Sequence, residues 1–211
     1  AAFEKIISAG LQTQQAFDSL APTLQAAKAG FTDVATTADA GVSLMKSGGL
    51  SDITQSYDLL FATMVEGKAQ FKDIATYLPK LAPTALNFGV ALEDVAGSYA
   101  YFTAQGQTAE KAANLLENTL KVLANPERAA AFKDIGVSFF DSAGKMRPIL
   151  DIAKELNVSL AGLSDQAKTE KLATLGLDME AAAGFAGLAQ NITGLQKAID
   201  ATSASAGAME K

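Results

Sequence analysis

The sequence predicts an all-α fold, either a multi-helix bundle or a stack of three-helix repeats, with one small β-hairpin near residues 137–147. Apolar residues recur at helical spacing along almost the whole chain, and glycines stand where these apolar stripes end. Alanine is abundant while aromatic residues make up only 7% of the chain, which favours helices that pack closely through small side chains. With 211 residues, 49% of them hydrophobic, the chain is long enough to bury a core.

The first predicted helix, 13–29, carries an apolar stripe and is stopped by Gly30. Pro22 lies inside it and is expected to kink or split it, because proline lacks a backbone N–H and its ring crowds the preceding turn. The stripe consists of Ala16, Phe17, Leu20, Leu24 and Ala27.

Two further helices are predicted to follow after short connections. Thr32 or Asp33 is expected to open the second helix, which the Gly48-Gly49 pair ends. Ser51 is the predicted N-cap of the third helix, which runs to Gly67. Short helices separated by glycine favour antiparallel packing of neighbours.

The next stretch repeats this plan. An apolar stripe over 71–89 is followed by another over 92–106, and Thr108 then caps an amphipathic helix that ends before Asn125-Pro126. The prolines expected to break the first of these stripes are Pro79 and Pro83.

Short identical segments recur with the same displacement. Leu20-Ala-Pro-Thr23 returns as Leu81-Ala-Pro-Thr84, and Asp33-Val-Ala35 returns as Asp94-Val-Ala96, each 61 positions later, from 20 to 81 and from 33 to 94. A common displacement favours a duplicated three-helix unit, although similar helix-boundary residues would give the same matches by chance.

The sequence therefore predicts three regions. Residues 1–126 form a helical block of two three-helix units, at about 12–67 and 68–126. Residues 127–163 hold a short helix, the hairpin and a second helix, and residues 164–211 hold the C-terminal helices and a linker. Because the chain opens with Ala rather than Met and has no signal peptide pattern, we expect it to be an interior fragment of a longer chain.

The hairpin is predicted from a break in the helical pattern. Residues Asp141–Gly144 can form a turn, residues 145–147 form the return arm, and Pro148 suits the first position of the next helix, 149–156. A single aspartate followed by Ser, Ala and Gly offers too few oxygens for a calcium loop. The strand-forming side chains before the turn are Val137, Phe139 and Phe140.

The C-terminal region begins with a helix capped by Ser164 and continues from Asp178 as a long segment rich in Ala and Gly. No residue between Glu180 and Lys197 is charged, but the run is short and contains Gln, Asn and Thr. We therefore expect a helix that packs closely through its glycines rather than a membrane span. The glycines concerned are Gly184 and Gly187.

Composition excludes several classes of function. The 23 acidic residues against 17 basic ones give a net charge of −6, which argues against a nucleic-acid surface. The chain has no cysteine and no histidine, so cysteine nucleophiles, Ser-His-Asp triads and zinc sites built on Cys or His are excluded. No Walker-type or G-x-G-x-x-G loop occurs. The sequence thus predicts no cofactor, no metal site and no enzyme.

Carboxylate pairs are the remaining candidates for catalysis. Glu93 and Asp94 stand together at a helix start, and Asp151 and Glu155 stand four apart on one helix face. Both pairs have ordinary structural explanations, because acidic residues stabilise helix N-termini and exposed faces. Neither is predicted to be catalytic, and no catalytic or binding residue is assigned.

Residues 59–156 resemble the core region of phage tail tape measure proteins, the chains that act as rulers inside long phage tails. The 132–147 segment, with its Gly-Val step, Asp-x-x-Gly turn and following Arg, is the most specific match. One departure is Thr174-Leu-Gly-Leu177, where the family often has a Phe-Gly step, so the resemblance weakens after about Leu163. The other matching segments are Phe71–Pro83, Phe88–Val95, Gln105–Glu110 with Leu115–Leu123, and Leu123–Pro126.

The resemblance implies a structural protein that lies in the lumen of the tail tube within the virion. It implies that the whole protein nucleates tube assembly with chaperones, sets tail length, and leaves with the DNA to reach the host cell envelope at infection. The implied partners are the tail tube protein, tail-tip or baseplate hub proteins, tail assembly chaperones and further copies of the chain. No catalytic residues, cofactors or sequence-specific nucleic-acid contacts are carried over.

Three alternatives stay open at this point. A delivery module would contact membranes and insert the uncharged 181–196 run into the envelope. A cell-wall hydrolase domain would cut peptidoglycan through a carboxylate. A cellular helical-repeat adaptor would present a concave binding face and would not associate with tails.

Overall fold

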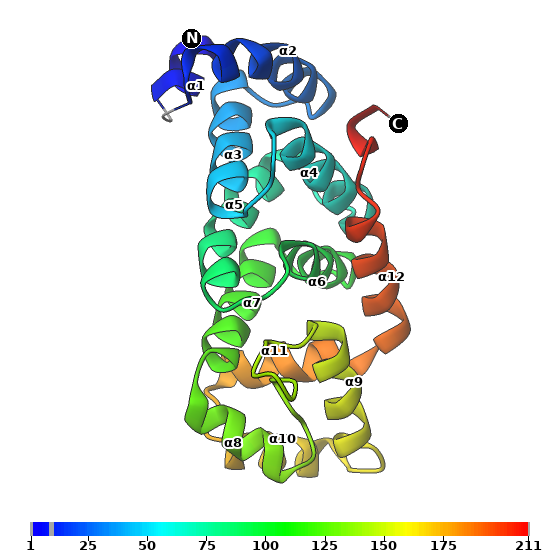
Figure 1. Cartoon of the computed structure of the whole chain (residues 1–211). Helices are drawn as coiled ribbons and strands as arrows, with labels where there is room; N and C mark the ends of the chain where they lie inside the picture. The colour runs from blue at the N-terminus through cyan, green and yellow to red at the C-terminus, as the bar shows by residue number, and fades with distance from the viewer. Residues whose placement is uncertain (1, 9–10, 211) are drawn as a thin grey trace.

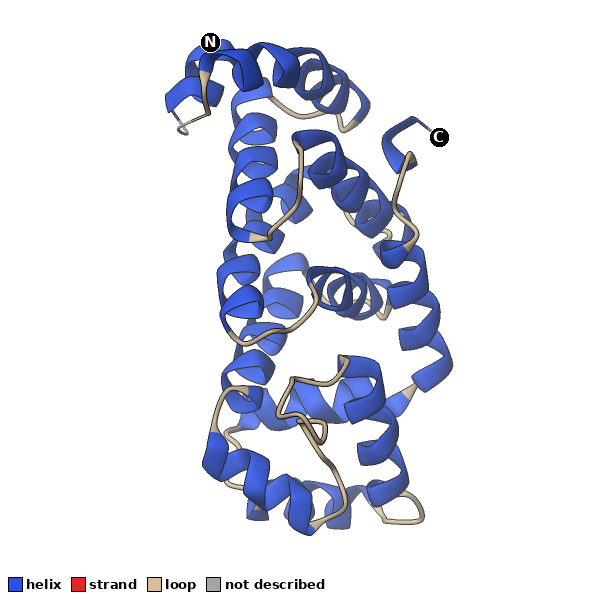
Figure 2. Cartoon of the chain, in the orientation of Figure 1, coloured by secondary structure: helices blue, strands red, loops and turns tan. Residues whose placement is uncertain are grey.

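The computed structural model describes residues 2–8 and 11–210, and within them the all-α prediction is confirmed. Twelve α-helices and one 3₁₀ turn form, and no strand forms among these residues (Figure 2). The helices are α1 (Ala2–Ser8), α2 (Thr13–Ala29), α3 (Val34–Ser47), α4 (Ile53–Gly67), α5 (Phe71–Asn87), α6 (Leu92–Ala104), α7 (Ala109–Leu123), α8 (Pro126–Asp134), α9 (Ile149–Leu160), α10 (Asp165–Thr174), α11 (Met179–Gln190) and α12 (Ile192–Ser203), with η1 (Ala208–Glu210) as the 3₁₀ turn.

The helices stack in one long body (Figure 1). The chain begins with α1 and α2 at one end and descends through α3 to α7 until α8 and α10 form the other end. It then returns through α11 and α12, and α12 packs against α9, α6 and α4 on the way back. The turn η1 finally contacts α4, so both chain ends lie on the same half of the stack.

The helix α6 lies at the centre of the core. Ten of its thirteen residues are buried, including Tyr99 and the charged Asp94. The return helix α12 crosses it at Gly97, where a Cβ in place of the glycine hydrogen would come within 2.5 Å of the Cα of Ile199. Glycine is required there because two helix backbones meet directly.

The expected splitting of helices at proline is wrong, while a kink at Pro22 stays a prediction. The helix α2 runs through Pro22, and α5 runs through both Pro79 and Pro83. A proline inside a helix costs about 3 kcal/mol locally. The helix α5 nevertheless buries an apolar face that includes Ile74 and Leu78, and α2 buries a face of small residues. This tertiary packing offsets the local cost.

Most of the predicted helix starts are confirmed. Asp33 Oδ1 accepts the N–H of Thr36 at 2.8 Å, and Thr108, Ser164 and Asp178 cap α7, α10 and α11 in the same way. Asp52 rather than Ser51 caps α4, since its carboxylate accepts the N–H of Gln55 at 3.0 Å. The hydroxyl of Ser51 instead donates to the side chain of Gln55.

The small β-hairpin near 137–147 does not form. Only one antiparallel bridge, between Phe140 and Met146, joins the two arms. The return arm is too short to extend this pairing, because Pro148 lacks an N–H and the N–H of Ile149 donates to Asp94 Oδ2 at the start of α9. Ser138 is held by side chains instead, since its N–H donates to Glu155 Oε2 at 2.8 Å and its carbonyl accepts from Arg147 Nη1 at 2.9 Å.

The uncharged C-terminal run forms two helices, α11 and α12, divided at Asn191. The close packing predicted for its glycines is confirmed, because a Cβ on Gly184 would lie 2.9 Å from the carbonyl of Leu115, and one on Gly187 would lie 2.7 Å from the Phe102 ring. Among the helices described, none combines the length and the apolar character needed to span a membrane.

Candidate functional site

The structure brings the two carboxylate pairs of the sequence to one helix start. Asp94 is buried, and its Oδ2 accepts the N–H of Ile149 at 2.9 Å. Pro148, which precedes α9, has no side-chain oxygen that could cap that helix. Asp94 of α6, far earlier in the sequence, takes this role. Burial raises the pKa of Asp94, and the negative charges of Glu93 and Asp151 add to the increase.

The second pair is divided between two structural contacts. Glu155 forms a 2.8 Å ion pair with Arg147 and holds the Ser138 N–H. Asp151 lies 3.9 Å from Lys154 on the exposed side of the helix. No carboxylate of either pair lines the large cavity described below, and the described part of the chain holds no group of three or more acidic residues placed to bind a metal ion.

A cavity of about 540 Å³ opens between two helix corners that are far apart in the sequence. The α6–α7 corner forms one wall, the α9–α10 corner forms the opposite wall, and α11 forms the floor. The floor is made of small residues, which leave the space unfilled. These residues are Ala183, Ala186, Gly187 and Ala189.

Two hydrogen bonds fix the floor to the walls. Tyr101 Oη donates to the carbonyl of Gly187 at 3.0 Å, and Asn157 Nδ2 donates to the carbonyl of Ala189 at 2.7 Å. Both acceptors lie in the last turn of α11, where helix carbonyls have no partner within the helix. Burial raises the pKa of the Tyr101 hydroxyl, so it remains protonated and able to donate.

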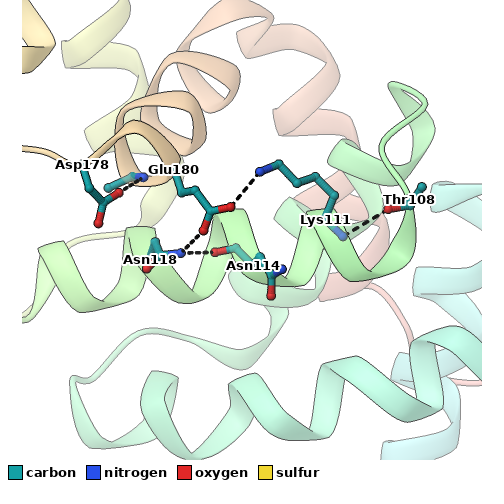
Figure 3. Close-up of polar contacts among 7 residues, drawn as sticks. Thr108, Lys111, Asn114, Asn118, Asp178 and Glu180 are labelled. Carbon is teal, nitrogen blue, oxygen red and sulfur yellow. Dashed lines mark hydrogen bonds and ion pairs between the residues drawn. The ribbon is translucent and has the colours of Figure 1, made fainter.

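A polar bridge joins α7 to α11 beside the cavity (Figure 3). Glu180 contacts Lys111 Nζ at 2.9 Å with one carboxylate oxygen and Asn118 Nδ2 at 3.0 Å with the other. The N-caps Thr108 and Asp178 fix the start of each helix close by. The bridge therefore sets the spacing of α7 and α11 on one side of the cavity.

An apolar surface lies on the α2 end of the stack. Phe17 is 56% exposed and Leu24 is 47% exposed on the outer face of α2, while Phe31 is 98% exposed. Phe31 also adopts a φ of 48°, in the left-handed region that aromatic residues avoid. Such exposed apolar side chains are candidates for contacts with other proteins.

Sequence reasoning found neither the cavity nor this apolar surface. The cavity depends on two corners separated by about fifty residues, whose contact no local pattern reveals. In the sequence, only the small residues of α11 pointed to the cavity. For the apolar surface, the only sequence signal was the helical stripe through Phe17 and Leu24, of which the structure buries Ala16 and Ala27.

Comparisons with known proteins cover most of the chain. The profile of the phage-related minor tail protein family matches residues 1–176, a longer stretch than the resemblance seen at 59–156. The tape measure protein of Pneumococcus phage Dp-1 is 28% identical over 176 residues, which are 82% of this chain and 15% of that protein. The probable tape measure protein of Escherichia phage P2 is 34% identical over 104 residues, which are 48% of this chain and 13% of that protein.

The chain thus spans less than a sixth of the length of either relative. No solved structure matches it. Since the family profile covers far more than half of the chain, the chain belongs to the phage-related minor tail protein family.

Proposed function

We propose that this chain is a structural segment of a phage tail tape measure protein, which contributes to tail length and to assembly of the tail tube. The observation that carries the proposal is the family match over 1–176, together with two relatives named as tape measure proteins. The all-helical stack supports it, because Asp94 serves as a helix cap and the half-buried Glu155 as a brace rather than as reactive groups.

The proposed place of the whole protein is the lumen of the tail tube in the virion, from which it leaves with the DNA and reaches the host envelope. The proposed partners are the tube protein, tail-tip or baseplate hub proteins, assembly chaperones and further copies. The exposed Phe17, Leu24 and Phe31 supply a surface suited to such contacts.

Two other functions receive no support. For envelope insertion, the uncharged run would have to leave the core, in which Phe185, Leu188 and Leu195 are buried. For peptidoglycan hydrolysis, two carboxyl groups should face one another across a cleft. The carboxyl groups singled out by the sequence instead hold backbone N–H groups and Arg147.

The test is tail length after an in-frame deletion of residues 68–126 in the phage that carries the gene. If the chain is a ruler that lies extended as helix, the loss of about 60 residues at about 1.5 Å per residue shortens the tail by about 90 Å. Electron microscopy of the tails measures this length.

The matched control replaces 68–126 by a helix-forming sequence of EAAAK repeats of the same length. A ruler that acts through chain length is then expected to give tails of normal length, whereas a folded module with another task gives normal tails in both phages and loses infectivity in both. Tails of unchanged length after the deletion would contradict the ruler function of this segment.

A further inference from the structure

We propose that α10 is a movable wall of the cavity, which swings away from the stack as an intact helix and widens the cavity while the other helices stay in place. The cavity has α10 on one side, where Asp165 and Lys168 line it. The opposite wall and the floor belong to α6, α7 and α11, which are packed into the core. This inference concerns the cavity and does not depend on the ruler function.

The helix α10 is held to the stack by few buried side chains. Leu172 is the one buried residue among its ten, and Leu175, directly after the helix, is the second apolar anchor. By contrast, six of the twelve residues of α9 and five of the twelve of α11 are buried. Segments with few buried apolar contacts open at a lower free energy than the core. We therefore expect α10 to separate from the stack before α9 or α11 does.

The hydrogen bonds that shape α10 come from its own residues. At its start, Ser164 Oγ accepts the N–H of Ala167 at 3.2 Å. On its exposed face, the side-chain amide of Gln166 donates to the carboxylate of Glu170 at 2.8 Å. These bonds need no partner in the stack, so they stay in place when the helix moves.

A glycine with positive φ stands near each end of α10. The φ angles are 73° at Gly162, between α9 and α10, and 71° at Gly176, between α10 and α11. Glycine moves between backbone regions that are closed to other residues. A Cβ on Gly162 would meet no atom within 4 Å, so this turn also has free space around it. Two such turns can absorb the backbone rotation that a rigid swing of the helix needs.

Two charged side chains hold α10 against the stack. Lys171 Nζ donates to the carbonyl of Ser159 at 2.8 Å and ties α10 to α9. Arg128 Nη1, on α8, donates to the carbonyl of Leu175 at 3.0 Å. The guanidinium also lies against Gly176, where an added Cβ would overlap it. Both hydrogen bonds must break when α10 swings out, so they set the ratio of open to closed molecules.

The test measures distances between pairs of spin labels in the 211-residue chain by pulsed electron spin resonance. The chain has no cysteine, so labels attach only at introduced ones. One pair, Ala104→Cys with Ala173→Cys, joins exposed positions of α6 and α10 across the cavity. We expect a main distance and a second, longer one from open molecules. The control pair, Ala104→Cys with Val158→Cys, spans from α6 to α9 without α10 and should give a single distance.

Two variants should shift the balance. Arg128→Ala and Lys171→Ala each remove one hydrogen bond from a charged donor, so each should raise the ratio of open to closed molecules about tenfold. Lys72→Ala removes an exposed lysine of α5 and should leave the ratio unchanged. In all three variants the control pair should keep its distance, and the amides of α10 should keep their protection from hydrogen exchange.

The proposal is overturned if the distance from α6 to α10 stays single in both Arg128→Ala and Lys171→Ala. It is also overturned if the control pair lengthens along with it, because the whole α9 corner then moves. Faster amide exchange within α10, in step with the longer distance, would show that the helix unfolds locally instead of swinging as a unit.

Discussion

The blocks α2–α4 and α5–α7 follow the same plan but occupy different positions in the molecule. Their helices have 17, 14 and 15 residues in the first block and 17, 13 and 15 in the second. The α3 helix packs on α5, and α4 packs on α6. The first block ends the stack and exposes Phe17 and Leu24, while α11 and α12 cover the second block.

The two repeated aspartates show how position changes the role of a residue. Asp33 caps its own helix, and hydrogen bonds from Thr36 hold the pKa of its carboxyl below the ordinary value. Asp94, its match in sequence, stands in the first turn of α6 rather than before it and caps α9 instead. Equal sequence spacing therefore does not place them equivalently, and the duplication remains a prediction.

Removal of α11, α12 and η1 should produce the largest difference in stability between the two blocks. A chain that ends at residue 176 lacks α11, α12 and η1 and exposes the faces of α6 and α7 that they bury. We expect loss of a cooperative thermal transition, with α6 and α7 losing amide protection before α2 and α3. Hydrogen exchange measured by mass spectrometry tests this order. Equal loss of amide protection in both blocks would show that they form one cooperative unit, whether or not α11 and α12 cover them.

Substitution of buried glycines should have the next largest effect on the free energy of unfolding. Gly97→Ala would place a Cβ 2.5 Å from the backbone of Ile199, so α12 must move away, and we expect a loss of about 3 kcal/mol. Gly41→Ala in α3 meets the ring of Tyr57 at 2.6 Å, a side chain that can rotate away in part, and we expect about 1–2 kcal/mol. Guanidinium unfolding measures both. A larger loss at Gly41 would contradict the expectation that a backbone contact yields less than a side-chain contact.

The buried tyrosines should respond in opposite directions. The hydroxyl of Tyr57 lies 2.7 Å from that of Thr23 and donates to the carbonyl of Thr37 at 3.3 Å. Tyr57→Phe is therefore expected to cost about 1–2 kcal/mol. The hydroxyl of Tyr99 in α6 is buried and has no partner within the described range, so Tyr99→Phe should leave stability unchanged or raise it slightly. Thermal unfolding of the two variants under identical conditions decides the point.

The smallest difference between the two blocks is expected in how the stabilising effects of Asp33 and Asp94 depend on pH. The lowered pKa of Asp33 means that its stabilising effect is present above the unfolded value and is lost as pH falls through the folded pKa. For Asp94 the folded pKa is raised, so its contribution is greatest at low pH and is lost as pH rises through that pKa.

Asp94→Asn keeps an acceptor for Ile149 and removes the buried charge. We expect the variant to be at least as stable as the parent at pH 7, with the difference shrinking as pH falls through the raised pKa. Denaturant unfolding between pH 7 and pH 4 follows this trend. A difference that grows in acid would show that the carboxylate, rather than its burial, governs the site.

Sequence patterns predicted the helices better than their contacts. Caps such as Asp33 and Thr108 are local, because each side chain bonds a backbone group three residues away. The predicted splitting of helices at proline failed because the energetic cost of a proline is local, whereas the tertiary packing that offsets this cost is not. The hairpin prediction failed for the same reason, since the N–H of Ile149, just after the return arm, donates to Asp94 from far earlier in the chain. The cavity needed two distant corners, and only the small residues of α11 hinted at it.

The attachment of the C-terminal turn to α4 also determines how the module yields to tension. The carboxylate of Asp58 accepts the N–H groups of Gly207 and Met209 at 2.7 and 2.9 Å and is the polar anchor of that turn. The turn follows α12 in the chain, so a pull on the C-terminal side loads this anchor before it loads α12. The contacts of η1 with α4 then break first, and those of α12 with α6 break after them. A pull on this end would thus break the Asp58 hydrogen bonds before it separates α12 from α6.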